Sequence, residues 1–304
     1  TTTILHRIIR LLKEPDINGS NLLLSTFTHD AAVSIKERLD VLIGPNNGIF
    51  CNTIDSFCAQ WINILHDSHD IRPDETGYVP PKSTEISYDV SELIEIVINE
   101  MRQNNPRLVQ HLKNIKYIIV DEFQDINGPQ AEWVLWFNKS FGTKIIVVGD
   151  DNQNIYTFRG SDVKYILNFQ DYLPENESLV SYELTYNYRS TPEIVLYANP
   201  ITRMDMKTPA ILMEKTRCVG YKPRPPSIVY LPSLDRQFSF IQYYIEKFHK
   251  SGKPYGEMVV LSRNNQLLYY AENYFLSIGL PLVLLEGYES QRTVAKPTHL
   301  TLST

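Results

Sequence analysis

The sequence has few of the features that mark secreted, zinc-bound or membrane-spanning proteins. Its only cysteines are Cys51, Cys58 and Cys218, and no C-x-x-C pair occurs. This pattern argues against a disulfide framework or a cysteine-based zinc site, and it suits a reducing compartment. No apolar run approaches the ~20 residues that a membrane-spanning helix needs, and no charged-then-apolar leader opens the chain. We expect a soluble intracellular protein, cytoplasmic or nuclear according to its source.

The sequence also lacks an excess of basic residues. Its 29 lysines and arginines stand against 35 aspartates and glutamates, which gives a formal net charge of −6. A protein that binds nucleic acid across a whole face is normally basic, so any such contact is expected in a local groove. Internal repeats and low-complexity tracts are missing too. At 304 residues the chain is long enough to bury a large core and to form two domains.

Short apolar runs alternate with helix-compatible stretches along the first part of the chain. The runs that predict strands are residues 21–27, 48–53, 116–122, 144–150 and 181–187. This alternation is typical of a parallel sheet that helices cover on both faces. A polar, proline-containing stretch at 67–85 interrupts it and predicts a loop or small insert.

The same alternation restarts after Pro192. Strands are predicted at 227–232, 257–263 and 281–287, and helices near 235–249 and 266–278. We therefore expect a first α/β domain at 1–190, with a small insert around 67–113, and part of a second α/β domain at 191–304. The join is placed near 190–226, where the sequence has no clear periodicity.

Three carboxylates follow the predicted strand that ends at residue 120, in the stretch VDEFQDINGPQ. In parallel α/β sheets ligands bind beyond the carboxyl ends of the strands. There Asp121 can hold Mg²⁺ on nucleotide phosphates, and Glu122 can activate an attacking water. In the alternative interpretation, Asp121 caps a turn, and Asp125 or Asn127 caps the helix that follows.

The next predicted strand leads into a second polar stretch, VVGDDNQNIYTFRGSD, at 147–162. It presents Tyr156, Phe158 and Arg159 close together, and exposed aromatic and cationic side chains are what single-stranded nucleic acid needs. Alternatively, Tyr156 and Phe158 are strand residues that face the core. Arg189, in TYNYRST, is predicted to end a further strand, from which it can reach a bound phosphate.

Together these stretches carry a resemblance to a known family. VDEFQDIN, VGDDNQNIYTFRGSD and YNYRST, in this order, resemble motifs II, III and IV of superfamily 1 DNA helicases of the UvrD/Rep type. Three further stretches resemble motif Ia, the motif after it and the family's VLxRxN strand, at 26–39, 52–62 and 258–266. The resemblance covers essentially the whole chain. It implies a RecA-like P-loop NTPase domain followed by the start of a second RecA-like α/β domain with a reduced accessory insert.

The resemblance implies an ATPase site with ATP and Mg²⁺ as cofactors. Asp121 would coordinate Mg²⁺ together with the hydroxyl of Thr1, and Glu122 would be the catalytic base. Gln153 would sense the γ-phosphate, and Arg189 would act as an arginine finger. The implied nucleotide-binding positions are Thr1, Thr2, Gln153 and Arg189.

The resemblance also implies contacts with single-stranded DNA and with duplex–single-strand junctions. The matching positions are Thr26, Phe27, Thr28, Ser56, Phe57, Tyr156, Phe158, Arg159, Arg263 and Asn265. Many family members have tryptophan where Phe158 stands, which weakens the stacking role of this residue. Phe57 as a core residue and Arg263 as a surface ion pair are the alternatives, and His29 is interpreted as a helix start rather than a ligand.

Three functions remain open at this point. The family resemblance favours an ATP-driven helicase or translocase with 3′ to 5′ direction, acting in DNA repair, replication or recombination. The family also includes helicase lobes of larger helicase–nucleases. A non-hydrolysing nucleic-acid-binding relative is the third possibility, and the matching residues Asp121, Glu122, Gln153 and Arg189 argue against it.

The two ends of the sequence lead to a first prediction. The family's phosphate loop, G-x-x-x-x-G-K-[ST], is represented only by its end at Thr1, and the sequence stops before the family's His-x-x-Lys-Gly motif. We therefore expect this chain to be the central part of a motor. A P-loop binds nucleotide through backbone N–H groups and a lysine, so residues 1–304 alone should show neither DNA-stimulated ATPase nor unwinding. Adding the native upstream loop and downstream motifs should restore both.

The measurement is a steady-state ATPase assay on purified residues 1–304, with and without single-stranded DNA. The Glu122→Gln variant, purified in the same way, controls for a contaminating ATPase. Hydrolysis that depends on single-stranded DNA and disappears in Glu122→Gln would contradict this prediction.

Overall fold

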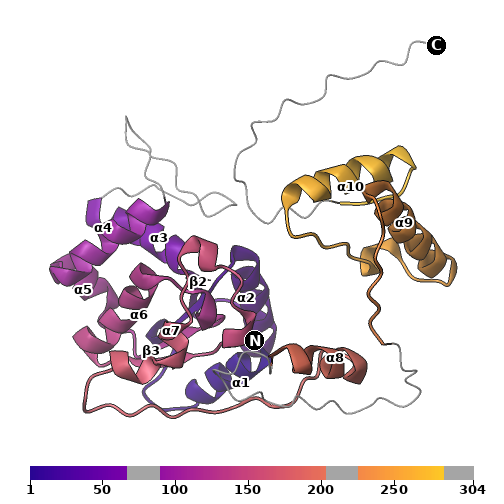
Figure 1. Cartoon of the computed structure of the whole chain (residues 1–304). Helices are drawn as coiled ribbons and strands as arrows, with labels where there is room; N and C mark the ends of the chain where they lie inside the picture. Colours follow the sequence, from indigo (N-terminus) through magenta and orange to yellow (C-terminus); the bar gives the residue numbers. More distant parts are fainter. Residues whose placement is uncertain (67–89, 203–224, 284–304) are drawn as a thin grey trace. The chain divides into compact units, whose positions relative to one another are not determined.

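The computed structural model describes residues 1–66, 90–202 and 225–283 (Figure 1). The chain divides into two compact units, Thr1–Thr185 and Tyr186–Thr304, and each is described by itself. The stretch at 67–85, predicted as a loop or insert, lies outside the described residues. Within them, no helix is long and apolar enough to cross a membrane.

The first unit is built on a four-stranded parallel sheet with the order β2-β1-β3-β4. The strands are β1 (Leu22–Thr26), β2 (Phe50–Thr53), β3 (Tyr117–Val120) and β4 (Lys144–Val147). Four of the predicted strands are thereby confirmed, and so is the α/β class. The two central strands β1 and β3 are buried along their whole length, which explains their uninterrupted apolar sequences.

One face of the sheet is covered by α1 (Thr2–Leu11) and α2 (His29–Ile43) (Figure 1). Successive strand residues point to opposite faces, so Leu22 and Leu24 of β1 pack on this side. The apolar residues of α1 recur at helical spacing and form its buried stripe. They are Ile4, Leu5, Ile8 and Leu11.

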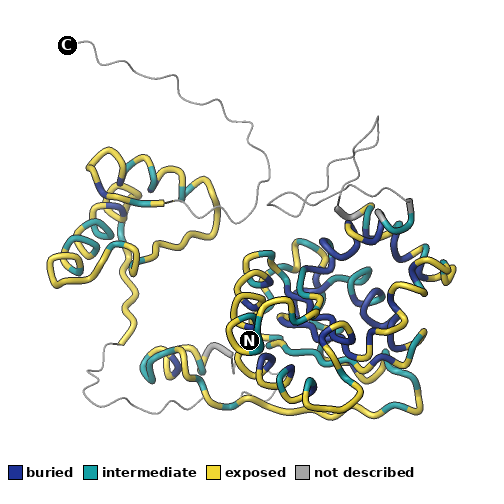
Figure 2. Tube along the Cα trace, turned by 180° about the vertical axis from the view of Figure 1, so that it is seen from behind, coloured by how far each residue is buried: buried dark blue, intermediate teal, exposed yellow. Residues whose placement is uncertain are grey.

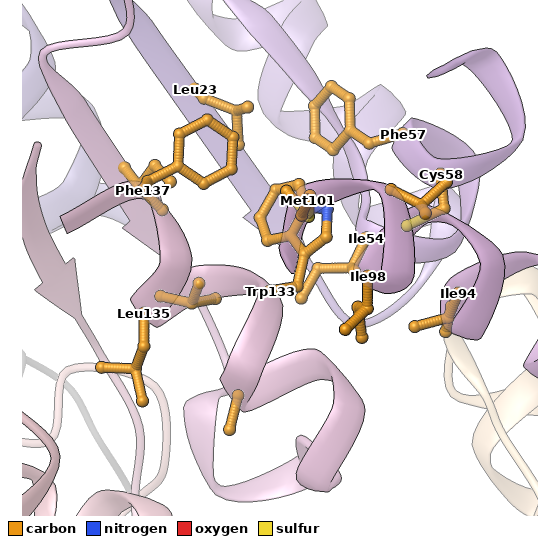
Figure 3. Close-up of a cluster of buried hydrophobic side chains, with 14 of the residues drawn as sticks. Leu23, Ile54, Phe57, Cys58, Ile94, Ile98, Met101, Trp133, Leu135 and Phe137 are labelled. Carbon is orange, nitrogen blue, oxygen red and sulfur yellow. The ribbon is translucent and has the colours of Figure 1, made fainter. Parts of the chain in front are cut away.

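The opposite face carries the larger core cluster (Figure 3). Leu23, Ile118 and Val120 point to this side from the strands, and Trp133 stacks on Trp61 with ring centroids 5.2 Å apart. The covering helices are α3 (Ile54–His66), α4 (Val90–Arg102), α5 (Pro106–Leu112) and α6 (Gly128–Phe141). Although α4 and α5 fall within the predicted insert region, they contribute to the same core as the rest.

The connection from β3 to α6 is short and well hydrogen-bonded. After the 3₁₀ turn Phe123–Asp125, the side chain of Asn127 accepts a hydrogen bond from the backbone of Gln130, whose side chain bonds back to the backbone of Asn127. This is a capping box, so the interpretation of Asn127 as a helix cap is confirmed. After β4 the chain forms 3₁₀ turns and the short α7 (Lys164–Leu167).

The strand predicted at 181–187 does not form. Tyr182, Leu184 and Tyr186 in this stretch are exposed, and no strand pairs with it in the described part of the chain. An apolar alternation gives β propensity, but a strand also needs a neighbouring ladder, and a parallel one needs a long crossover. The segments between β4 and residue 181 are only short helical turns.

The described part of the second unit contains α8 (Pro192–Thr202), α9 (Leu234–Lys250) and α10 (Asn265–Ser277). The helices predicted near 235–249 and 266–278 are therefore confirmed. α9 and α10 pack through a small cluster of Phe238, Ala271, Phe275 and Leu280, and most of their remaining surface is exposed (Figure 2).

The strands predicted in the second unit are not found among the described residues. Residues 227–232 and 257–263 form no ladder, and residues 281–283 are likewise outside any strand, while 284–287 are not described. Tyr230 and Leu261 are 90% and 86% exposed. An apolar run forms a strand only where a neighbouring strand completes its ladder, and the described part of the second unit contains no strand that could do so.

Candidate functional site at the edge of the sheet

Parallel pairing places the loops after β3 and β4 side by side. Val120 lies opposite Val147 in the register of the two strands, and the backbone N–H of Phe123 donates to the carbonyl of Val148 at 2.9 Å. The acidic turn after β3 and the polar stretch after β4 therefore leave the sheet at one edge. This is the edge where ligands bind in parallel α/β sheets.

Asp121 and Thr1 meet at this edge. The hydroxyl Oγ1 of Thr1, which precedes α1, donates to Oδ2 of Asp121 at 3.4 Å. Burial raises the pKa of Asp121, and the neighbouring Glu122 carboxylate raises it further, whereas the Thr1 hydroxyl lowers it. A carboxylate that is disfavoured by burial and by a like charge is stabilised by a bound cation.

The donor atoms at this corner fit Mg²⁺. Hydroxyl and carboxylate oxygens are hard ligands, and Mg²⁺ is usually held by one or two carboxylates together with substrate phosphates rather than by a cage of protein atoms. The described residues contain no group of three or more His, Cys, Asp or Glu that could hold a metal ion. An ion at this corner would take Thr1 and Asp121 as protein ligands, because their oxygen atoms meet there.

Glu122 has an unusual backbone conformation. Its φ of 55° and ψ of 44° lie in the left-handed region, which costs a residue other than glycine on the order of 1–3 kcal/mol. Among the residues that the structure describes, Asn46 and Asn104 are the other non-glycine residues with positive φ, and asparagine tolerates this region well. The side chain of Glu122 is exposed, and its Oε2 accepts a 2.8 Å hydrogen bond from Nε2 of Gln124. The carboxylate of Glu122 therefore faces solvent while the hydrogen bond from Gln124 holds it in place.

Gln124 is a residue that the sequence analysis missed. It is only 1% exposed, and its Oε1 accepts a 3.0 Å hydrogen bond from the backbone N–H of Asp150 after β4. Gly149 makes room for it, since a Cβ at this glycine would lie 2.6 Å from Oε1 of Gln124. One signal in the sequence could have identified Gln124. Its amide stands between the apolar residues Phe123 and Ile126, in a turn whose burial could be predicted.

Residues 154–160, here called the aromatic loop, are anchored on the turn after β3. Nδ2 of Asn154 donates to the backbone carbonyl of Gln124 and, at 2.9 Å, to Oγ of Ser161. Its Oδ1 accepts a 2.8 Å hydrogen bond from Thr157. Because both ends of the amide are used, Asn154 fixes the start of the loop against the acidic turn.

The aromatic loop presents two rings and a cation. The ring of Tyr156 lies 4.6 Å from that of Phe27 and 6.0 Å from that of Phe158, which is 78% exposed. The guanidinium carbon of Arg159 is 5.3 Å from the centroid of Tyr156 and 5.8 Å from that of Phe158. The alternative that Tyr156 and Phe158 are strand residues facing the core is therefore wrong.

Three of the predicted DNA-contacting side chains are interior. Thr26, Ser56 and Phe57 are all less than a tenth exposed. Thr26 Oγ1 donates to the carbonyl of Thr28, and Ser56 accepts from the hydroxyl of Thr53.

Phe57 packs against Trp61 and Trp133 (Figure 3), so its interpretation as a core residue is confirmed. The ring cannot stack on a base in this arrangement, and the predicted contact is corrected accordingly. A motif match assigns a role to a sequence position. The direction of the side chain, however, depends on the helix face to which the residue belongs.

Four other predicted residues of the first unit lie at the surface or at helix starts. Thr28 is exposed and caps α2 by accepting from the backbone of Ala31 at 3.3 Å. His29 is the first residue of α2, as interpreted from the sequence.

Gln153 is exposed, and its Nε2 donates to Oδ2 of Asp150 at 2.6 Å. Thr2, the first residue of α1, is also exposed, and its hydroxyl accepts a hydrogen bond from Arg38 at 3.1 Å. Both predicted nucleotide-facing side chains are thus open to solvent, although each already contacts a neighbour.

The remaining predicted residues belong to the second unit. Arg189 is exposed and lies just before α8, so the prediction that it ends a strand is wrong. Arg263 is also exposed, and Asn265 is the first residue of α10. Their participation in a site with the first unit stays a prediction.

Asp125 is a buried carboxylate within the acidic turn. It is 7% exposed, its Oδ2 accepts a 3.3 Å hydrogen bond from Gln124, and its Oδ1 has no hydrogen-bond partner. Burial and the nearby Glu122 carboxylate raise the pKa of Asp125 to about 6, although hydrogen bonds from Gln124 and from the backbone of Ile155 lower it.

The raised pKa of Asp125 predicts how stability depends on pH. Its folded-state pKa of about 6 exceeds the unfolded value near ~4, so its contribution to stability is complete below pH ~4 and is lost as the pH rises through 6. As the pH rises from 4 to 7, the unfolding free energy of Asp125→Asn should therefore increase relative to that of the unmodified protein. Urea denaturation in EDTA at several pH values measures this.

Asp162→Asn is the matched control, because Lys164 lowers the pKa of Asp162. Because Asp162 titrates at or below the unfolded value near ~4, the unfolding free energy of Asp162→Asn should differ from that of the unmodified protein by a nearly constant amount between pH 4 and 7. If the Asp125→Asn and unmodified proteins follow parallel curves from pH 4 to 7, Asp125 does not have the raised pKa.

Comparison with known proteins agrees with the geometry of this edge. A model of the family "UvrD/REP helicase N-terminal domain" matches residues 1–77 and 75–174, which include all four strands and the aromatic loop. Proteins named ATP-dependent DNA helicase PcrA from Staphylococcus epidermidis and Staphylococcus aureus are 25% and 26% identical over 354 and 355 aligned residues. Each alignment covers 94% of this chain and 47% of the relative, so the chain spans about half the length of the curated relatives it matches. The chain belongs to the UvrD/Rep helicase family.

Proposed function

We propose that the protein carrying this chain is an ATP-dependent DNA helicase. It would hydrolyse ATP with Mg²⁺, move along single-stranded DNA in the 3′ to 5′ direction, and separate strands at duplex–single-strand junctions during repair, replication or recombination. One observation carries the proposal. The edge of the sheet that holds Thr1, Asp121 and Glu122 is hydrogen-bonded, through Gln124 and Asn154, to an exposed aromatic loop.

The side chains at the acidic turn suit phosphoryl transfer to water. Thr1 and Asp121 would hold Mg²⁺, which would offset negative charge on the phosphate oxygens. Glu122 would accept the proton of the attacking water, because its exposed carboxylate lies next to Asp121 and is held by a hydrogen bond. Gln153 would contact the γ-phosphate, and Arg189, from the second unit, would supply positive charge.

The aromatic loop suits single-stranded DNA. Bases of any sequence can stack on Phe158 and on the exposed part of Tyr156, which Phe27 supports from behind. Arg159 places a cation beside both rings of the loop, where it can contact the sugar-phosphate backbone. A local site of this kind is compatible with a net charge of −6.

The role of Glu122 as general base predicts a separation of binding from turnover. Glu122→Gln in the protein carrying this chain should still bind Mg·ATP, but DNA-stimulated turnover should fall by ~10² to 10⁴-fold, the usual contribution of a positioned base. Steady-state ATPase kinetics and titration with a fluorescent ATP analogue measure the two quantities. Glu132→Gln, at an exposed ion pair between Glu132 of α6 and Arg102 of α4, is the control and should keep full turnover.

Two outcomes would argue against this assignment. Undiminished turnover of Glu122→Gln removes Glu122 from the base role. An unmodified protein that binds DNA but hydrolyses no ATP supports the non-hydrolysing relative instead.

The role of the aromatic loop predicts a loss of DNA affinity that leaves the ATPase chemistry intact. Tyr156→Ala should weaken binding of single-stranded DNA by ~1–3 kcal/mol, the usual loss for one stacking aromatic residue. DNA-independent ATPase should change little. Fluorescence anisotropy at fixed salt measures the affinity, with Tyr182→Ala, at an 85% exposed tyrosine outside the loop, as control. Unchanged affinity together with a lower melting temperature would show that Tyr156 serves only packing.

A further inference from the structure

The buried side chain of Gln124 uses its amide in both directions. Nε2 donates to Oε2 of Glu122 at 2.8 Å and to Oδ2 of Asp125 at 3.3 Å, while Oε1 accepts from the backbone N–H of Asp150 at 3.0 Å. An amide has donors only on nitrogen and acceptors only on oxygen. The opposite orientation would set the oxygen against two carboxylates, so the amide has one stable orientation.

Packing prevents Gln124 from moving alone. A Cβ at Gly149 would lie 2.6 Å from Oε1 of Gln124 and 3.1 Å from its backbone nitrogen, so the chain after β4 lies directly against this residue. The hydrogen bond from Asp150 lies in the same place. Any shift of the loop after β4 must therefore displace the amide that holds Glu122.

A hydrogen-bonded link continues from this turn to the aromatic loop. Nδ2 of Asn154 donates to the backbone carbonyl of Gln124. Asn154 also holds Thr157, one residue after Tyr156. The Glu122 carboxylate and the ring of Tyr156 are thus the two ends of one continuous set of contacts.

We propose that Gln124 is a positioning residue through which the aromatic loop sets the placement of the Glu122 carboxylate for hydrolysis. It touches no reacting atom and acts only through Glu122. The inference rests on the proposed role of Glu122 as general base. It assigns to one buried amide the physical connection by which DNA bound at the aromatic loop stimulates turnover.

The test removes both hydrogen-bonding functions of the amide at similar volume. Gln124→Met in the protein carrying this chain should lower DNA-stimulated kcat by ~10- to 100-fold, because small misplacements of a catalytic group have effects of this size. The KM for ATP and the Kd for single-stranded DNA should stay within about 2-fold, since Gln124 is only 1% exposed and offers almost no surface to a ligand. In a Glu122→Gln background, Gln124→Met should cause no further loss, because no base remains to be positioned.

A second variant and a matched control separate positioning from folding. Gly149→Ala pushes on the amide without altering it, and it should lower kcat in the same pattern even if Gln124→Met does not fold. Asn138→Leu removes an equally enclosed amide, 5% exposed, which bonds to Glu177 and Thr143 on another part of the unit. It should lower the melting temperature and leave kcat unchanged.

Full kcat in Gln124→Met or in folded Gly149→Ala overturns the inference. So does a loss from Gln124→Met that is equally large in the Glu122→Gln background, because Gln124 would then act independently of Glu122. If Glu122→Gln itself keeps full turnover, the proposed base role fails, and the inference fails with it. The single Glu122→Gln variant therefore distinguishes failure of the proposed function from failure of the inference alone.

Discussion

The parallel pairing of β3 with β4 is the constraint on which the rest of the site depends. Hydrogen bonds continue the ladders past the strand ends, from Asp121 N–H to the Ser25 carbonyl and from Val148 N–H to the Val120 carbonyl, both at 2.9 Å. The acidic turn therefore begins from the fully buried β3, and the stretch that leads to the aromatic loop begins from the partly buried β4 that pairs with it. Groups held on strand ends keep their geometry better than groups on free loops, which is what a catalytic carboxylate requires.

The same edge carries a cost to stability that is concentrated in a few residues. Burial and repulsion by the Glu122 carboxylate raise the pKa of Asp121 and of Asp125, and Glu122 adopts a left-handed backbone conformation. Each feature disfavours the folded state, and under the proposed function a bound cation would offset the repulsion between the carboxylates. We infer that the large apolar core on both faces of the sheet stabilises a site that is locally unfavourable.

The sequence predicted those parts of the molecule that follow from local pattern. Strands β1 and β3 were found because buried parallel strands have continuous apolar runs, and the Asn127 cap because its side chain bonds to nearby backbone. The predicted strand at 181–187 failed because a ladder needs a neighbour that no local pattern encodes. Gln124 was missed and Phe57 was misplaced for a related reason, since the direction and partners of a side chain are set by tertiary packing.

The connection between the acidic turn and the aromatic loop is most directly measured by hydrogen exchange with mass spectrometry on the protein carrying this chain. Peptides covering residues 121–126 and 148–156 are followed alone, with a non-hydrolysable Mg·ATP analogue, and with oligothymidylate. The account predicts that DNA slows exchange in both peptides, although of these two segments it contacts only the aromatic loop. It also predicts that Tyr156→Ala removes this effect while the nucleotide's effect persists. Protection by DNA at 148–156 with no change at 121–126 would contradict it.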